Sequence, residues 1–228
     1  MEKLRPGLRG VAERVARSIS EGTLLGLGSG STVAGLLEEL SPLIAKKGVA
    51  VRGVPTSTQI EMVATKSGIS IVPFMGSVDL VIDGADQVDS RLNLIKGGGG
   101  ALLREKVLMS SAKKVVIVAG EEKFAPMLCA GGVKVPVEAV PFARKSVKSK
   151  LSQLGGAPEE RLLPKGYPYF TENGNVILDT SFAPIDEPAA LEGRVKNLPG
   201  VVEVGIFTIK PITVYKVKES GKFEVLGG

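Results

Sequence analysis

The chain has 228 residues, of which 43% are hydrophobic, and a formal net charge of +5. This suffices for one large domain, or for one medium and one small domain, and the positive charge favours anionic partners such as phosphates or nucleic acid. There is no histidine, and Cys129 is the only cysteine, which excludes histidine-assisted triads, zinc sites of histidine and cysteine, and an intramolecular disulfide. Acid–base chemistry must therefore fall to carboxylates, lysines or hydroxyls.

The sequence also bears on location. Its purely apolar runs, such as residues 115–119, are far shorter than the roughly 20 residues that a membrane-spanning helix needs. The N-terminal residues 1–6 lack the apolar stretch of a secretory signal. We therefore expect a cytoplasmic protein with no membrane partner.

The first part of the chain, up to residue 132, alternates short β-branched runs with helical patterns. This alternation is typical of consecutive βαβ units and a mainly parallel sheet. The predicted helices cover 11–19, 31–40 and 59–67, the second ending before Pro42, and the predicted strands cover 23–27, 48–54, 69–72, 80–82 and 115–118. We therefore predict an α/β fold with a doubly wound, mainly parallel Rossmann-like sheet.

The pattern changes after Gly132. A strand at 133–140, a basic helix, a helix at 189–197 and a strand at 201–207 favour a smaller α+β domain, and Asn173-Gly174 predicts a type I′ hairpin between strands 167–170 and 175–178. A last predicted strand, at 213–217, returns to the parallel sheet of the first part of the chain. We predict a Rossmann-like domain of residues 1–132 plus 208–228, and a small domain of residues 133–207 through which subunits associate, with 201–206 as its edge strand.

A glycine-rich loop, Gly26–Thr32, joins a predicted strand to a helix. Backbone N–H groups and the helix dipole can hold an anion there, and Ser29, Ser31 and Thr32 add hydroxyl donors, although an ordinary tight turn is the alternative. The loop lacks the last glycine of a dinucleotide motif and the lysine of a nucleoside-triphosphate loop, and the next strand ends without a ribose-binding acid. A small phosphorylated ligand therefore fits better than a nucleotide.

The second motif, Asp83-Gly84-Ala85-Asp86, follows the apolar strand 80–82. Its carboxylates should emerge at the carboxyl end of the sheet, where open α/β folds bind ligands. Two carboxylates near hydroxyls can move protons between sugar oxygens or assist ring opening. Ordinary turn or cap chemistry is the alternative, since Asp-Gly is common in turns.

The third motif is a run of four glycines, Gly97–Gly100, between Lys96 and a predicted helix that carries Glu105. Ordering consecutive glycines costs much conformational entropy, so the run makes sense if bare amides wrap a ligand. Lys96 would then place a positive charge where an enediolate oxygen develops, and Glu105 could take a proton alpha to a carbonyl. An ordinary exposed helical glutamate is the alternative for Glu105.

Two basic segments carry weaker signals. Lys145, Lys148 and Lys150 lie opposite the apolar spacing of their predicted helix, which indicates a solvated face rather than nucleic-acid contact. The segment 121–124 follows a predicted strand. It either places Lys123 at the edge of the ligand-binding crevice at the carboxyl end of the sheet, or it simply begins a helix.

Taken together, these motifs resemble the ordered signature set of the type A ribose-5-phosphate isomerases. The similarity rests on segments 26–32, 56–59, 83–86, 96–106 and 121–124, and it continues through 136–144, 171–179 and 198–206. The resemblance implies an aldose–ketose isomerase of the non-oxidative pentose phosphate pathway, which interconverts D-ribose 5-phosphate and D-ribulose 5-phosphate through an enediolate. It also implies no metal, no cofactor, and a homodimer or homotetramer.

The resemblance further assigns roles to matched positions. Glu105 is the implied proton acceptor, and Glu105, Asp83, Asp86 and Lys96 form the implied catalytic set. The implied substrate-binding residues, with the phosphate at Ser29–Thr32 and backbone contacts at Gly97–Gly99, are Ser29, Gly30, Ser31, Thr32, Asp83, Gly84, Ala85, Asp86, Lys96, Gly97, Gly98, Gly99 and Lys123.

The chain departs from the family's pattern at two places. Leu8 stands where the family carries a basic residue that reaches the phosphate, which leaves Arg5 and Arg9 as candidate replacements. Gln87 stands in place of the acidic residue that usually follows the second aspartate.

Other functions remain open at this level. A related isomerase or deaminase could act on a hexose or amino-sugar phosphate, since these motifs do not determine the length of the sugar. A non-catalytic sugar-phosphate sensor would need an attached DNA-binding element, and no helix-turn-helix pattern precedes Gly26. Nucleic-acid binding is a distant third, so we expect a sugar phosphate and no nucleic acid as partner.

Overall fold

The computed structural model describes residues 5–228, with side chains from Pro6 onward. Contacts divide the chain into two compact units. The first unit comprises the chain up to Gly84, Arg104–Glu122 and Ile209–Gly228, and the second comprises Ala85–Leu103 and Lys123–Thr208.

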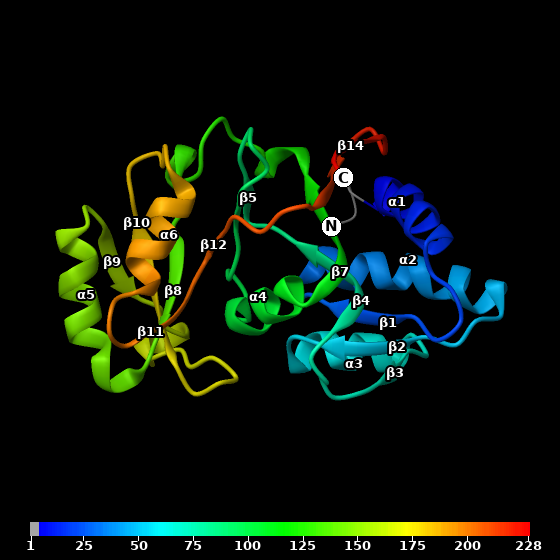
Figure 1. The fold of residues 1–228 in the computed structure, drawn as a ribbon, viewed down its shortest axis with the longest axis horizontal. Coiled ribbons are helices and arrows are strands. Elements are labelled where there is room, and N and C mark those ends of the chain that lie inside the picture. Colours follow the sequence, from blue (N-terminus) through cyan, green and yellow to red (C-terminus); the bar gives the residue numbers. More distant parts are fainter. Residues whose placement is uncertain (1–4) are drawn as a thin grey trace. The chain divides into compact units, whose positions relative to one another are not determined.

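The first unit is built on a seven-stranded sheet in the order β14-β13-β7-β4-β1-β2-β3 (Figure 1). All neighbours are parallel except β14, which runs antiparallel to β13 at one edge. Its strands are β1 (Leu24–Leu27), β2 (Arg52–Pro55), β3 (Ser70–Ile71), β4 (Val78–Gly84), β7 (Ala112–Gly120), β13 (Thr213–Val217) and β14 (Phe223–Gly227). Its helices are α1 (Arg5–Arg17), α2 (Ser31–Lys47), α3 (Thr58–Lys66) and most of α4 (Leu102–Ser110).

Successive side chains of a strand point to opposite faces of the sheet, and this explains why helices cover both faces. Leu25 and Leu27 of β1 are fully buried in a core to which α1, α2 and α3 contribute their apolar stripes. Gly26 faces the other side, where a Cβ atom would lie 3.3 Å from Leu108 of α4. Apolar residues on both faces of a strand require helices on both sides of the sheet.

Helix α2 corrects one prediction, since it continues through Pro42 to Lys47 instead of ending before the proline. Buried apolar residues lie on both sides of the proline, including Leu40 before it and Ile44 after it. Burial of this stripe outweighs the local cost of a proline in a helix, because most helical stability in proteins comes from tertiary packing.

The second unit contains two small antiparallel sheets. A four-stranded sheet has the order β11-β8-β10-β9, and a three-stranded sheet has the order β12-β6-β5. The strands are β5 (Gln87–Val88), β6 (Leu94–Ile95), β8 (Val135–Ala139), β9 (Ala157–Glu160), β10 (Val176–Ser181), β11 (Val201–Val204) and β12 (Ile206–Phe207). The helices are α5 (Arg144–Gln153), α6 (Pro188–Lys196) and the short 3-10 turns η3 (Ala130–Gly132), η4 (Pro141–Ala143) and η5 (Pro164–Gly166), and η2 (Glu121–Lys123) begins in the first unit.

The mainly parallel sheet with helices on both faces and the smaller antiparallel unit confirm the predicted fold class. The division by contacts differs from the predicted domain boundaries, because residues 85–103 and 123–132 belong to the second unit. In the three-stranded sheet β6 pairs with both β5 and β12, which explains why residues 85–103 belong to the second unit. The predicted division into a catalytic domain and a small domain for subunit association remains a prediction.

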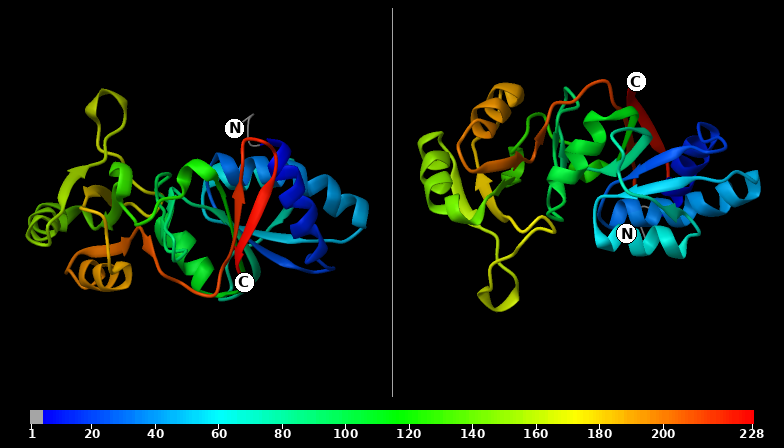
Figure 2. Two further views of the ribbon diagram at one scale, coloured as in Figure 1. Left: turned by 90° about the horizontal axis from the view of Figure 1, so that it is seen from above. Right: turned by 60° about the horizontal axis from the view of Figure 1, so that its bottom comes forward.

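The chain reverses in a hairpin at Asn173-Gly174, as predicted, with Phe170 bridging Val176, but the predicted type I′ turn is wrong. Gly174 has a φ of 77°, but Asn173 is not among the non-glycine residues with positive φ, whereas a type I′ turn needs positive φ at both positions. The Gly174 N–H donates to the Thr171 carbonyl at 2.9 Å and the Thr171 N–H to the Asn175 carbonyl at 2.8 Å, which gives a longer three-residue loop. Two further views show the chain between β9 and this loop projecting from the second unit (Figure 2).

No helix in the described part of the chain, residues 5–228, is both long enough and apolar enough to cross a membrane.

The start of β4 yields a stability prediction. Asp79 accepts a hydrogen bond from the Leu24 N–H at 2.8 Å and pairs with the Lys113 ammonium at 2.8 Å. The hydrogen bond from Lys113, then that from Leu24, lowers the pKa of Asp79 below its ordinary 3.8. The ionised carboxylate therefore stabilises the fold above pH 3.8, and this contribution is lost as the pH falls through the lowered value.

Asp79→Asn should lower the free energy of unfolding at pH 7 by about 0.5–1 kcal/mol, a small value because the ion pair is exposed to solvent. The difference from the unchanged protein should shrink below pH 3.8, as measured by urea unfolding at several pH values. Glu224→Gln, which breaks the exposed pair with Lys218, is the control and should cost less. A difference that persists undiminished in acid would contradict the argument.

Candidate active site

The loop that follows β1 has the geometry of an anion site. Gly30 precedes α2 with a φ of 95°, and Ser31 and Thr32 begin the helix. The first N–H groups of a helix lack partners within it and carry the positive end of its dipole. Ser29, which is half-buried, bonds through its hydroxyl to the hydroxyls of Thr56 at 2.8 Å and Ser57 at 2.7 Å.

Thr56 and Ser57 support this loop, although neither was among the predicted site residues. The Thr56 N–H and hydroxyl both donate to the Leu27 carbonyl, at 3.0 and 2.9 Å. Ser57 caps α3 by accepting from the Ile60 N–H, and the Gln59 side chain accepts from the Gly30 N–H at 3.4 Å. The sequence signal is a run of hydroxyl residues before a helix, which by itself predicts only a cap.

Asp83, at the end of β4, lies against the same loop. It is fully buried, its Oδ1 accepts from the Gly84 N–H at 2.7 Å, and a Cβ atom on Gly28 would lie only 2.0 Å from its carboxyl carbon. The Gly28 N–H also donates to the Ile82 carbonyl at 2.9 Å. Since the chain leaves β1 for β2 on one side while β4 lies on the other, this place is a topological switch point, where open α/β sheets bind ligands.

Glu105 lies in the first turn of α4, and its side chain is buried, with 5% exposure. The ordinary alternative, an exposed helical glutamate, is therefore wrong. A buried carboxylate is costly unless its surroundings compensate for it, and such groups cluster at functional sites. Its role as proton acceptor remains a prediction.

Asp86, Lys96 and Gly97–Gly99 belong to the second unit. The Asp86 N–H donates to the Ile95 carbonyl at 2.8 Å, and its Oδ2 accepts from the Gly98 N–H at 2.7 Å. Lys96 is 3% exposed, with its ammonium 5.8 Å from the centre of the Phe207 ring. Asp86, Lys96 and the glycine loop, Gly97–Gly100, are therefore brought together within this unit.

The glycine loop needs its glycines for geometric reasons. Gly97 and Gly100 have φ values of 107° and 80°, and a Cβ atom on Gly98 would lie 2.8 Å from an Asp86 carboxylate oxygen. The carbonyls of Gly97–Gly99 accept hydrogen bonds from Arg161 and Tyr169. Neither of these two residues stands out in the sequence.

The remaining residues named from the sequence differ in how far they are buried. Gly84 ends β4 and Ala85 follows it, both of them half-buried, and Lys123 is exposed in η2. Leu8 is 1% exposed in the core of the first unit, so it is a packing residue. Arg9 is exposed and lies 3.8 Å from Glu13, and the side chain of Arg5 lies outside the described residues.

Gln87 and Cys129 have structural surroundings. The buried Gln87 side chain donates to the Ala130 carbonyl and accepts from the Cys129 N–H, both at 2.7 Å. Burial raises the pKa of the Cys129 thiol to about 11. The thiol therefore stays protonated near neutral pH and is a poor nucleophile.

The contact between Gly28 and Asp83 can be tested by stability. Gly28→Ala should force Asp83 or the loop to move and lower the free energy of unfolding by about 1–3 kcal/mol, as overpacking does. Gly193→Ala in α6 is the control, because no atom lies within 4 Å of its added Cβ apart from the neighbouring residues and the backbone of its own helix, and alanine favours helix. Urea unfolding followed by circular dichroism measures both, and equal stabilities for Gly28→Ala and the unchanged protein would contradict the close contact.

Comparison with known proteins identifies the family. Residues 52–221 match the family model described as ribose 5-phosphate isomerase A (phosphoriboisomerase A). The ribose-5-phosphate isomerase A of Methanothermobacter thermautotrophicus is 43% identical over 86% of this chain and 87% of the relative, and that of Methanosarcina acetivorans is 44% identical over 89% and 86%.

Solved structures agree with this assignment. Ribose 5-phosphate isomerase A from Methanocaldococcus jannaschii superposes with a TM-score of 0.90 at 36% identity over 100% of this chain and 99% of its own. A D-ribose-5-phosphate isomerase in complex with phospho-erythronic acid gives 0.91 at 32% identity, with the same coverage. These similarities confirm the resemblance that the motifs indicated, and the chain belongs to the ribose 5-phosphate isomerase A family.

Proposed function

We propose that this protein is an aldose–ketose isomerase that interconverts D-ribose 5-phosphate and D-ribulose 5-phosphate. Family membership carries this proposal, since the relatives match over most of their length and are named for this activity. The similar structure in complex with phospho-erythronic acid supports a phosphorylated sugar as the ligand class.

Glu105 is the base in this proposal. Its carboxylate removes the C2 proton of open-chain ribose 5-phosphate, and the electron pair of the C–H bond forms the double bond of an enediolate. The proton returns at C1 while the hydroxyl proton passes from O2 to O1 and the C2–O double bond forms, which gives the ketose and restores the carboxylate. Burial in the first turn of α4 supports this role, because removal of water strengthens a carboxylate as a base.

The Ser29–Thr32 loop holds the phosphate in this proposal. The N-terminus of α2 provides backbone N–H groups and a partial positive charge, and Ser31 and Thr32 add hydroxyls. Ser29 is already fixed by Thr56 and Ser57, so the loop is ordered before a ligand arrives. Such preorganisation reduces the entropy lost on binding.

The remaining residues act on the sugar oxygens. Lys96 and the amides of Gly97–Gly99 stabilise the charge that develops on the enediolate, and one of the two carboxylates, Asp83 or Asp86, assists ring opening. Gly84, Ala85 and Lys123 complete the sugar contacts. No cofactor or metal is needed in this scheme, since the proton removed is also the proton returned.

Glu105→Gln tests the base. The amide keeps the shape of the carboxylate but cannot accept the proton, so turnover should fall at least about 1,000-fold while ribose 5-phosphate still binds. Ketose formation in metal-free buffer measures turnover, and calorimetry measures binding.

Glu61→Gln is the matched control, because Glu61 lies in the first turn of α3 but is exposed. It should leave turnover unchanged. Absence of turnover by the unchanged protein would refute the proposed activity, and near-normal turnover by Glu105→Gln would refute the assigned base. A sensor would bind without turnover, and faster turnover of a hexose or amino-sugar phosphate would identify a related enzyme.

We also propose a cytoplasmic homodimer or homotetramer that associates through the second unit. Several large apolar side chains there are exposed, led by Phe142 at 99% and Tyr167 at 66%, and β11 forms an edge of the four-stranded sheet. Large exposed apolar side chains often mark interfaces between proteins. The single buried cysteine fits a reducing compartment.

Light scattering after size exclusion tests the association. The mass should be two or four times 23.8 kDa, and Phe142→Ser should shift it towards a monomer. Val225→Ser, an exposed apolar residue of the first unit, should not change the mass. A monomeric unchanged protein would overturn this proposal and leave the activity unaffected.

A further inference from the structure

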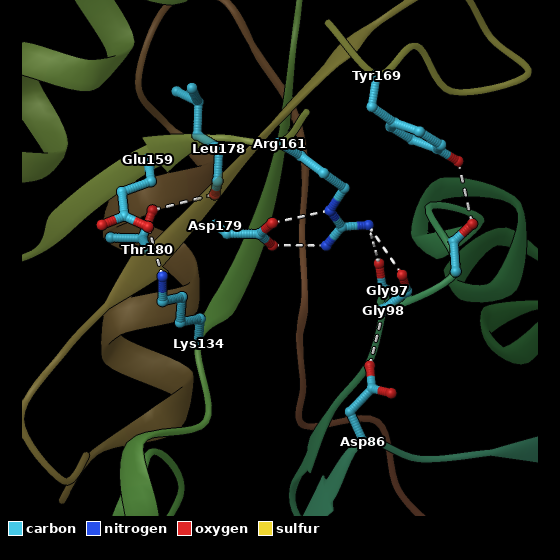
Figure 3. Close-up of polar contacts among 11 residues, drawn as sticks. Asp86, Gly97, Gly98, Lys134, Glu159, Arg161, Tyr169, Leu178, Asp179 and Thr180 are labelled. Carbon is cyan, nitrogen blue, oxygen red and sulfur yellow. Dashed lines mark hydrogen bonds and ion pairs between the residues drawn. The ribbon is translucent and has the colours of Figure 1, made fainter. Parts of the chain in front are cut away.

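The glycine loop is held from one side by two residues of a projecting segment. This segment, residues 161–169, begins after β9, and the Tyr169 N–H donates to the Arg161 carbonyl at 3.0 Å. Arg161 and Tyr169 therefore face each other at its base, with the guanidinium carbon 5.7 Å from the ring centre. Figure 3 shows both side chains directed towards the glycine loop.

Three successive carbonyls of the loop accept hydrogen bonds from these two side chains. Arg161 Nη1 donates to the carbonyls of Gly97 at 2.9 Å and Gly98 at 3.0 Å. The Tyr169 hydroxyl donates to the carbonyl of Gly99 at 3.1 Å. Burial raises the pKa of Tyr169, which keeps this hydroxyl protonated as a donor.

Asp179 of β10 fixes the arginine. Its carboxylate accepts from Arg161 Nε at 2.8 Å and from Nη2 at 2.5 Å, and both side chains are largely buried (Figure 3). A paired guanidinium of this kind is planar and rigid, so Nη1 is aimed at the loop. Lysine has a single nitrogen and cannot reach Asp179 and two carbonyls together.

The bonds to the carbonyls also set the direction of the amides. In a trans peptide the C=O and the following N–H point in opposite directions, so the amides that follow Gly97 and Gly98 point away from Arg161. The Gly98 N–H accordingly donates to Asp86 on the opposite side of the loop. The Gly98 amide thus faces the predicted substrate-binding carboxylate of Asp86.

We propose that Arg161, Asp179 and Tyr169 are positioning residues that hold Gly97–Gly99 so that the amides of Gly98 and Gly99 face the substrate. The proposal rests on the proposed isomerase function of the same loop. A run of glycines has no side chains to fix its conformation and loses much entropy on ordering, so external contacts must hold it. None of the three residues needs to touch the substrate.

Arg161→Lys is the main test. The lysine keeps the positive charge but leaves the carbonyls of Gly97 and Gly98 without their shared donor, so the kcat for ribose 5-phosphate should fall about 10- to 100-fold. The KM should change less than about threefold, because the phosphate is bound by another loop. Tyr169→Phe should lower kcat less, since it removes a single hydrogen bond.

Two matched controls separate this effect from general damage. Arg144→Lys makes the same substitution at the Arg144–Glu160 pair of the second unit, and Tyr167→Phe makes the same change on the projecting segment. Both should retain the kcat of the unchanged protein. Thermal unfolding of all four variants establishes that they are folded.

Hydrogen exchange of the 96–102 peptide gives a readout that does not depend on catalysis. Loss of the positioning contacts should speed exchange there in Arg161→Lys and Tyr169→Phe but not in the controls. If the unchanged protein is inactive and exchange still speeds up, the proposed function fails and the positioning role stands. Unchanged exchange and kcat in both variants, or equal losses in the controls, would overturn the positioning role.

Discussion

The pairing of β1 with β4 is the constraint on which the site of the first unit depends. Because the two strands are parallel neighbours, the loop after β1 and Asp83 at the end of β4 emerge side by side. Only a glycine at position 28 leaves room for the Asp83 carboxylate, which would lie 2.0 Å from a Cβ atom there. The N-terminus of α2 and a buried acid are thus adjacent, as a parallel sheet allows at the ends of neighbouring strands.

The second unit meets a different constraint. The first unit uses regular strands to place side chains, whereas the second unit uses a segment without a regular conformation of its own, Gly97–Gly100. Its order comes from partners distant in sequence, above all Arg161, which lies 64 residues from Gly97. Backbone amides can then recognise a ligand in place of side chains. The residues that hold those amides must themselves be rigid.

The sequence predicted the parallel layer and the position of each motif well, because strand periodicity and βα connections are local signals. It failed where tertiary packing or turn geometry decided the outcome, as at Pro42 and at the Asn173-Gly174 turn. It could not reveal the burial of Glu105, since a helical glutamate has the same local pattern inside and outside a protein. The sequence did not indicate Arg161 and Tyr169, because they bind backbone carbonyls. Every residue has a carbonyl, so no pattern of residue types marks such partners.

The buried thiol of Cys129 has a practical consequence. It lies in the apolar core of the second unit, and it is the only cysteine in the chain. A thiol reagent can therefore react only when that core opens, and its reaction rate reports the opening equilibrium of one unit alone. The molecule thus carries a single-site probe of the local stability of its second unit without any engineered label.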